Sequence, residues 1–297
     1  MKNPQYFSTR LSIPTLKSSA VLLSSMVLMG TSQAATWFQA YGSGNWDSIT
    51  WGSGNGAGSG AGFVENDGLV FIDVNSTVTL GHTQTIGSLS LQRSNGNGQL
   101  NLASASANLT VTGNATLGLN PSDTLSGTLD VSDGAISVGG VTTINTNGVF
   151  NLSGGSYSSA GTTVHGVVNL SGGSIMDSAT SLFSASSNLA FDFGGLDGSS
   201  MVTWDAADIS VVDGAMLSLN GLGGLGVGSY DLMSFSNSLV GDYDGNYTLD
   251  GLSNGLAGSI AYDSDSVYLN VVAAVPEPTS AALLSIGTLG FLMKRRR

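Results

Sequence analysis

The residue spacing that most resembles a chemical site lies in an acidic loop in the last third of the 297-residue chain. Asp242, Asp244 and Asn246 stand at alternate positions, and Asp250 follows shortly after. Carboxylate and amide oxygens are the ligands that a hard cation such as Ca²⁺ takes. The loop departs from an EF-hand in the positions of its glycine and its closing residue. It predicts a calcium site at these four residues, and the alternative is a turn built from ordinary turn-forming residues.

Catalytic motifs are otherwise scarce. The two histidines, His82 and His165, lie far apart beside turn-forming residues, where a solvated or capping role is commoner than a catalytic one. We expect no nucleophile elbow, and the sequence contains no H-E-x-x-H. Gly221–Gly226 matches G-x-G-x-x-G, but no helical pattern follows it to complete a dinucleotide site. We therefore expect no enzymatic activity, and no cofactor besides the calcium.

Besides a structural role, for which the evidence is given below, the sequence leaves two classes of function open. Trp46, Trp51 and Trp204 would make a carbohydrate-binding or adhesive module if they were exposed, whereas buried tryptophans would only pack a cap or the core. The third class is a β-helical polysaccharide-degrading enzyme, which rests on fold analogy. A glycosidase needs two carboxylates about 5 to 10 Å apart, and no sequence pattern brings two together.

The elements that would position such residues are short strands in a repeat. Segments 127–136, 148–157 and 166–175 align with one another at spacings of 21 and 18 residues. Apolar and polar residues alternate within each copy, which is typical of a strand with one buried side. The inward-facing residues are expected to be Leu129, Phe150, Val168, Val131, Leu152 and Leu170, and the outward-facing ones Asp130, Asn151 and Asn169.

This pattern predicts an all-β fold, specifically a parallel β-helix or β-solenoid with short Gly/Ser/Asn-rich rungs over residues 35–196. A solenoid needs caps, because its terminal rungs expose unpaired backbone. The aromatic residues of segment 36–73 are expected to form the N-terminal cap, and longer strands over 197–274 an antiparallel C-terminal cap. The turn of its closing hairpin is expected at 263–266.

Composition excludes several kinds of partner. The chain has 20 acidic residues against 8 lysines and arginines, and no cysteine. Between residues 18 and 293 the one basic side chain besides histidine is Arg93. Such a body cannot neutralise phosphates, which excludes nucleic-acid binding. Without cysteine there are no disulfides and no zinc–thiolate sites.

The N-terminus has the parts of a secretory signal peptide over residues 1–34. A basic leader precedes an apolar run from Ala20 to Met29, and small residues follow it. The pattern predicts export through the Sec machinery and cleavage by signal peptidase after Ala34 or Ala35.

The C-terminus is a second targeting segment, over residues 275–297. Pro276 and Pro278 keep its start extended, and an apolar stretch then predicts a single transmembrane helix over 279–293. By the positive-inside rule the basic end of the chain stays in the cytoplasm and the body outside. That basic end consists of Lys294, Arg295, Arg296 and Arg297.

This tail resembles the PEP-CTERM sorting domain of exported Gram-negative bacterial proteins. The resemblance implies that Pro276, Glu277 and Pro278 are recognised by an exosortase, so that the inner-membrane anchor is transient. The body resembles the β-helical repeats of autotransporter passengers, through Gly-Asn-Trp-Asp-x-x-x-Trp at 44–51 and the Leu-Ser-Gly-Gly repeats. Because PEP-CTERM systems accompany exopolysaccharide and biofilm production, we expect a structural protein of the cell surface or extracellular matrix, with exopolysaccharide as a partner.

Overall fold

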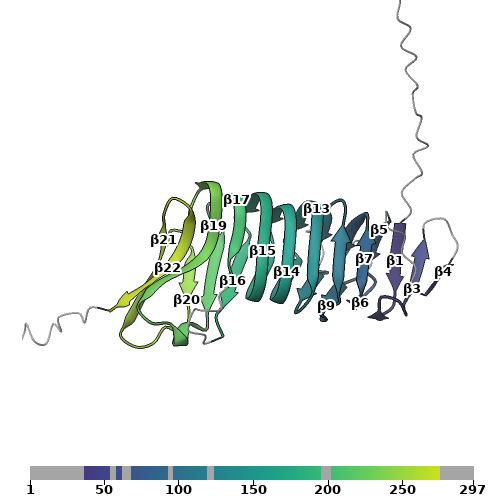
Figure 1. Cartoon of the computed structure of the whole chain (residues 1–297), viewed down its shortest axis with the longest axis horizontal. Coiled ribbons are helices and arrows are strands. Elements are labelled where there is room, and N and C mark those ends of the chain that lie inside the picture. The colour runs from purple at the N-terminus through teal and green to yellow at the C-terminus, as the bar shows by residue number, and fades with distance from the viewer. Residues whose placement is uncertain are drawn as a thin grey trace, which may run out of the picture. The chain divides into compact units, whose positions relative to one another are not determined.

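The computed structural model of the chain describes residues 37–53, 58–61, 68–92, 96–118, 124–194 and 202–274, all within one compact unit. Within these residues the fold is nearly all β, and the one helical segment is a single 3-10 turn, η1, Leu222–Gly224. The strands lie one behind another along the long axis of this unit (Figure 1). Most neighbouring strands pair in parallel, which confirms the all-β prediction at the level of strand content and direction.

Parallel pairing joins segments one repeat apart and builds three faces along this axis. The strands of the first face pair in this order: β2 (Gly44–Asn45), β6 (Ser76–Leu80), β9 (Gly98–Leu102), β12 (Gly127–Val131), β14 (Gly148–Val164), β15 (Val167–Phe183), β16 (Asn188–Asp192), β18 (Met216–Asn220) and β20 (Tyr247–Leu249). The long strands β14 and β15 contribute only their first residues to this face.

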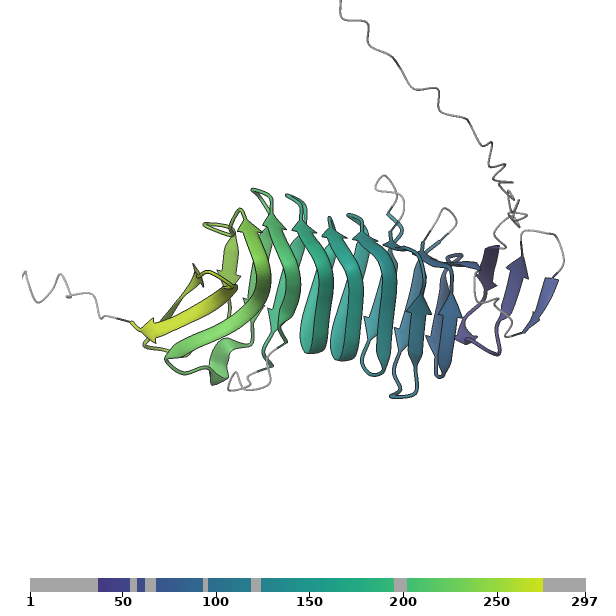
Figure 2. The same ribbon diagram turned by 45° about the horizontal axis from the view of Figure 1, so that its top comes forward.

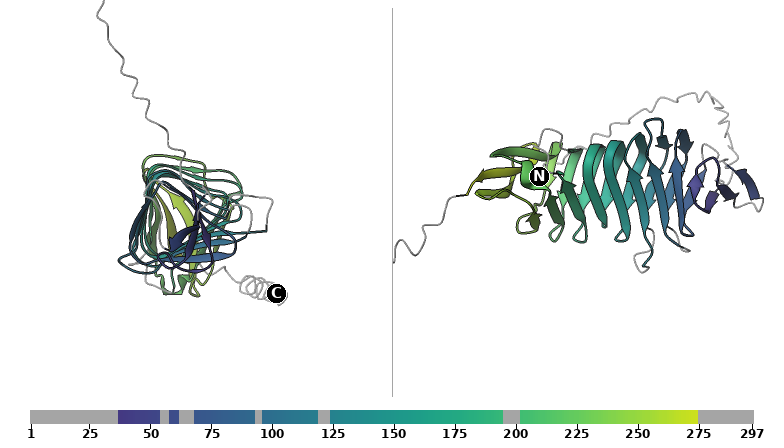
Figure 3. Two further views of the ribbon diagram at one scale, coloured as in Figure 1. Left: turned by 90° about the vertical axis from the view of Figure 1, so that its right-hand side faces the viewer. Right: turned by 90° about the horizontal axis from the view of Figure 1, so that it is seen from below.

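The second and third faces share their long strands. The second face runs through β7 (Thr83–Ile86), β10 (Asn108–Val111), β13 (Ala135–Ile144), β14, β15, β17 (Trp204–Val211) and β19 (Gly228–Val240). The third face begins with β1 (Trp37–Tyr41), β5 (Leu69–Ile72), β8 (Ser88–Leu91) and β11 (Ala115–Leu117), and continues through the second halves of β13, β14, β15, β17 and β19. Seen along the axis, the successive layers superpose (Figure 3).

The repeat predicted from the sequence stacks in register. Leu129 lies opposite Phe150, and Phe150 opposite Val168. The side chains of all six predicted inward residues are at most 1% exposed. The three predicted outward residues are half-buried or exposed. Because parallel strands lie about 4.7–4.9 Å apart, each core column is a continuous row of apolar side chains.

Glycines make the corner before the first face possible. A Cβ on Gly98 would lie 1.7 Å from the carbonyl oxygen of Ile72, and one on Gly127 would lie 2.2 Å from that of Leu91. The chain can turn this tightly only where no side chain is present. The Gly-rich rungs therefore follow from backbone packing at the corner.

The two ends of the unit are antiparallel. At the N-terminal end β1 pairs with β3 (Thr50–Ser53), which pairs with β4 (Gly58–Ala61). At the C-terminal end β22 (Ser266–Ala273) pairs with β19 on one side and with β21 (Leu256–Tyr262) on the other, and these strands cross the stack obliquely (Figure 2). Parallel pairing does not end at residue 197 but continues through β17, β18 and β20, so antiparallel pairing begins later than expected.

Several predicted segments lie outside the described residues. These are the signal peptide 1–34 with Ala34 and Ala35, the sorting motif at Pro276, Glu277 and Pro278, the transmembrane segment 279–293 and the basic end at 294–297. Across the described ranges, no helix has the length and apolar character needed to cross a membrane.

Candidate functional site

An open groove of about 670 Å³ lies near the C-terminal end of the second face. Its floor follows one outward-facing column, in which Met176 pairs with Asp205 and Asp205 with Ser234. Its wall is the turn between β21 and β22. The residues that line it are Met176, Asp177, Ser178, Asp205, Ala206, Ala207, Asp231, Ser234, Phe235, Ser236, Asp263, Asp265 and Ser266.

Carboxylates dominate the wall of this groove. Asp263 accepts hydrogen bonds from the backbone N–H groups of Asp265 (3.1 Å) and Ser266 (2.7 Å), and these contacts lower its pKa. The neighbouring carboxylate of Asp263 raises the pKa of Asp265, and the negative charge of Asp231 adds to the effect. Ser234 donates a hydrogen bond from its hydroxyl to Asp205. The groove therefore offers hydrogen-bond acceptors and negative charge.

Beneath the groove, Asp177 is buried at the corner between the second and third faces, with 3% of its surface exposed. Its Oδ1 accepts the hydroxyls of Ser159 (2.5 Å) and Thr162 (3.0 Å). Its Oδ2 accepts the Ser181 hydroxyl (2.6 Å) and the indole N–H of Trp204 (3.3 Å). Burial raises the pKa of Asp177 although all four donors favour the ionised form.

The Asp177 network extends into the preceding layer. Tyr157 is buried and donates its hydroxyl to Thr142. Burial raises the Tyr157 pKa, and the charge of Asp177 raises it further. Every oxygen of Asp177 is engaged by protein donors, so this network is built to hold the core together, and a ligand would have to displace one of those donors.

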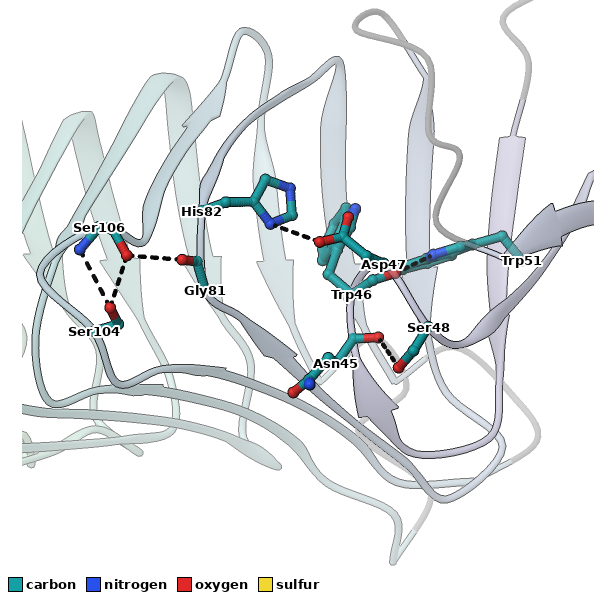
Figure 4. A network of polar contacts seen from close by, with 9 residues as sticks. All are labelled: Asn45, Trp46, Asp47, Ser48, Trp51, Gly81, His82, Ser104 and Ser106. Atoms are coloured by element: carbon teal, nitrogen blue, oxygen red, sulfur yellow. Dashed lines mark hydrogen bonds and ion pairs between the residues drawn. The ribbon is translucent and has the colours of Figure 1, made fainter.

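One of the two histidines, His82, contacts a carboxylate at the N-terminal end (Figure 4). His82 Nδ1 lies 3.2 Å from Asp47 Oδ2, with both side chains exposed to solvent. The nearby hydroxyls of Ser104 and Ser106 bond to each other, and Ser106 donates to the carbonyl of Gly81 (2.8 Å). Both hydroxyls are engaged away from the imidazole, so these residues are not arranged as a nucleophile with its base.

The predicted calcium ligands do not converge. Among the described residues, no group of three His, Asp or Glu side chains is placed to hold a metal ion. Asp242 instead accepts the backbone N–H of Asp244 (3.0 Å), and the N–H groups of Asn246 and Asp250 bond to the carbonyls of Tyr243 and Leu219. Asp242, Asp244 and Asn246 precede β20 (Tyr247–Leu249) and Asp250 follows it, so the calcium site stays a prediction without support from the described geometry.

The three tryptophans that could form a carbohydrate-binding surface only if exposed are buried, with Trp46 1% exposed and Trp51 and Trp204 fully covered. Trp46 and Trp51 pack together at 4.7 Å between ring centroids. Trp204 packs edge-on against Phe183 at 5.1 Å. Of the two alternatives, packing in a cap or the core is therefore the one that these three residues adopt.

Sequence reasoning missed Asp177, although a signal for it was present. Extending the aligned repeats by two residues places Asp177 opposite Ser159, at an inward-facing position that Val138 and Val111 occupy in the two layers before Ser159. The groove carboxylates gave no such signal, because Asp205, Asp231 and Asp263 come from three separate strands or turns.

Comparison with known proteins does not assign the chain to a family. No model of a known protein family matches the chain, and no curated protein matches its sequence. The fold and site therefore define the class only as an all-β protein of stacked, mainly parallel strands with an acidic groove.

Proposed function

We propose that this protein is an exported β-solenoid of a Gram-negative bacterium that serves as a structural component of the cell surface or extracellular matrix. In this proposal the leader 1–34 directs export, and the PEP-CTERM tail 275–297 tethers the chain to the inner membrane until an exosortase processes it at Pro276 to Pro278. Exopolysaccharide is the surrounding partner. The body itself acts as a rigid, hydrated rod.

The observation that carries the structural role is a ladder of side-chain hydrogen bonds along the first face. Gln99 Nε2 and Asn151 Nδ2 both donate hydrogen bonds to the carboxylate of Asp130, and each donor–acceptor distance is 2.5 Å. Asn169 Nδ2 donates to Asn151 Oδ1 over 2.7 Å in the next layer. These polar groups bond to the layers above and below. Such ladders stiffen a stack of parallel strands and leave a hydrated outer surface.

Cell fractionation with mass spectrometry of the mature C-terminus tests this proposal. We expect the exported chain to lack Lys294 to Arg297, and we expect the double variant Pro276→Ala, Pro278→Ala to keep them and accumulate in the inner membrane. Pro121→Ala, in the body of the chain, is the matched control and should be processed normally. An exported wild-type chain that retains the basic end would contradict the proposal.

A second candidate function, carbohydrate binding, is favoured by the groove. Its carboxylate and hydroxyl oxygens are suited to accept and donate hydrogen bonds to sugar hydroxyls, and exposed Met176 offers an apolar contact. Binding of the producing organism's own polysaccharide would be compared for wild type and the double variant Asp205→Asn, Asp231→Asn. Asp133→Asn, in an exposed turn away from the groove, is the control. Equal binding by all three chains would remove this candidate.

A further inference from the structure

The C-terminal end of the stack leaves an apolar layer incompletely covered. Across the described ranges, large apolar side chains that pack on the core while staying only partly buried all come from residues 230–262. Elsewhere the core columns are sealed by the next layer of strands. The residues of this end layer are Tyr230, Leu239, Tyr247, Leu249, Leu252, Leu256 and Tyr262.

The outermost strand of this end, β21, has an unprotected edge. β21 pairs with β22 along all seven of its residues without a register shift, and no second described strand pairs with it. Its sequence, Leu-Ala-Gly-Ser-Ile-Ala-Tyr, contains no charge and no proline. Proteins normally protect such edges with charged residues, proline, bulges or short length. β21 has none of these protections.

The other free edges are different. β4 at the N-terminal end has four residues, and its pairing with β3 contains a register irregularity. β2 has two residues, β20 three and β7 four, and each pairs with one described strand. The second half of β19, beyond its pairing with β22, pairs with β17 alone. These free edges are all shorter than the seven residues of β21. A long open edge is therefore a property of β21 among the described strands.

The side chains of β21 leave room for another strand. Ile260 is buried and Leu256 half-buried on the inner side, where a Cβ on Gly258 would lie 2.8 Å from Leu249. Ala257 and Ser259 point outward and are exposed. A strand added to this edge would meet only small outward side chains, and its own inward residues would extend the apolar layer over the half-buried end.

The occupant that fits is a second copy of this chain. The chain's own tail starts beside β21, because the N–H of Ala274 bonds to the carbonyl of Gly255 (2.8 Å), but Pro276 and Pro278 cannot donate ladder hydrogen bonds. A second β21 brings an uncharged edge of equal length and its own half-buried end layer. We propose that two copies pair β21 with β21 antiparallel about a two-fold axis, joining two stacks at their C-terminal ends.

Sedimentation of the chain recovered from cells tests the proposal. Wild type should form a dimer that dissociates on dilution, and Ala257→Lys and Ser259→Lys should each raise the dissociation constant at least tenfold. Ser137→Lys places the same charge at an exposed position of β13, which is paired on both sides, and should leave the dimer intact. A chain that is monomeric at all concentrations, or a dimer that tolerates both β21 lysines, would overturn the proposal.

Because the chain has no cysteine, single spin labels locate the contact directly. Labels on Ser259→Cys should give one short distance between copies, while labels on Ser137→Cys should lie far apart. A dimer without the short Ser259 distance would contradict pairing through β21. Protection of the β21 amides that does not change with concentration would assign the edge to the chain's own tail and would equally refute the dimer.

Discussion

The middle of the stack and its C-terminal end contain similar apolar residues, which are fully buried in the middle and only half-buried at the end. In the middle, β14 and β15 have neighbours on both sides, and Phe150, Leu152 and Leu189 are at most 1% exposed. At the end, β21 has one neighbour, and Leu256 and Leu249 stay half-buried. The difference shows that burial in this fold comes from the next layer and not from the local sequence, because a single coil cannot cover its own apolar side.

The largest expected effect comes from the same substitution made in the two regions. Leu189→Ala removes a fully covered side chain from the middle and should lower the free energy of unfolding by about 2–5 kcal/mol. Leu256→Ala, at the half-buried end, should cost less than half as much. Denaturant unfolding followed by circular dichroism compares the two. Equal losses would show that the end is packed as tightly as the middle.

The buried carboxylate should give the next largest effect. Asp177→Ala removes the acceptor of the Ser181 hydroxyl and the shortest contact of the Ser159 hydroxyl, and should cost about 1–3 kcal/mol of stability. Asp177→Asn keeps the shape and removes the charge, so it should be the milder change. Unfolding measurements at one pH rank the three chains.

The pH dependence of Asp177 follows from its raised pKa. Between the unfolded value near 3.8 and the higher folded value, the native state binds more protons than the unfolded state. The contribution of Asp177 to stability is therefore full at low pH and falls as pH rises through that window. Asp177→Asn should gain stability relative to wild type as the pH rises above about 4. A constant difference between the two chains would show that Asp177 does not titrate there.

Replacing a corner glycine by alanine should lower the free energy of unfolding by about 1–3 kcal/mol, the usual cost of overpacking. In Gly127→Ala the new Cβ would press against the carbonyl of Leu91, so adjacent layers must separate. Gly81→Ala meets nothing within 4 Å and is the matched control, expected to be neutral or slightly stabilising. The shift in thermal midpoint measures both. If the two variants unfold alike, the corners are not limited by backbone contact.

The smallest effect is expected on the outer surface. Asn151→Ala breaks the first-face ladder between Asp130 and Asn169 and should cost about 0.5–1.5 kcal/mol, the usual contribution of a partly exposed hydrogen bond. Ser259→Ala at the open edge, where no such ladder is present, should change stability by less. A null effect of Asn151→Ala would weaken the rigid-rod interpretation.

The sequence predicted the strand stack well, because alternation and repeat spacing are local signals. The inward row Leu129, Phe150 and Val168 is confirmed, as is the closing turn at 263–266 between β21 and β22. These residues follow the two-residue period of a strand, which packing in the neighbouring layer only reinforces.

The candidate site could not be predicted in the same way. Asp205, Asp231 and Asp263 meet only because the hairpin folds back across β19, a contact that no spacing encodes. The calcium prediction on Asp242 and Asp250 was not supported because alternate acidic residues also suit a turn held by backbone hydrogen bonds. The tryptophans were ambiguous in sequence, since an aromatic residue between turns suits either a surface or a cap.

Hydrogen exchange of the whole chain, followed by mass spectrometry at low and high protein concentration, tests most directly the contrast between a sealed stack and an open C-terminal end. We expect the amides of β14 and β15 to exchange slowly at both concentrations, and those of β21 to exchange quickly in the dilute chain and slowly in the concentrated one. Slow exchange of β21 in the dilute chain, or fast exchange of β14, would contradict this contrast.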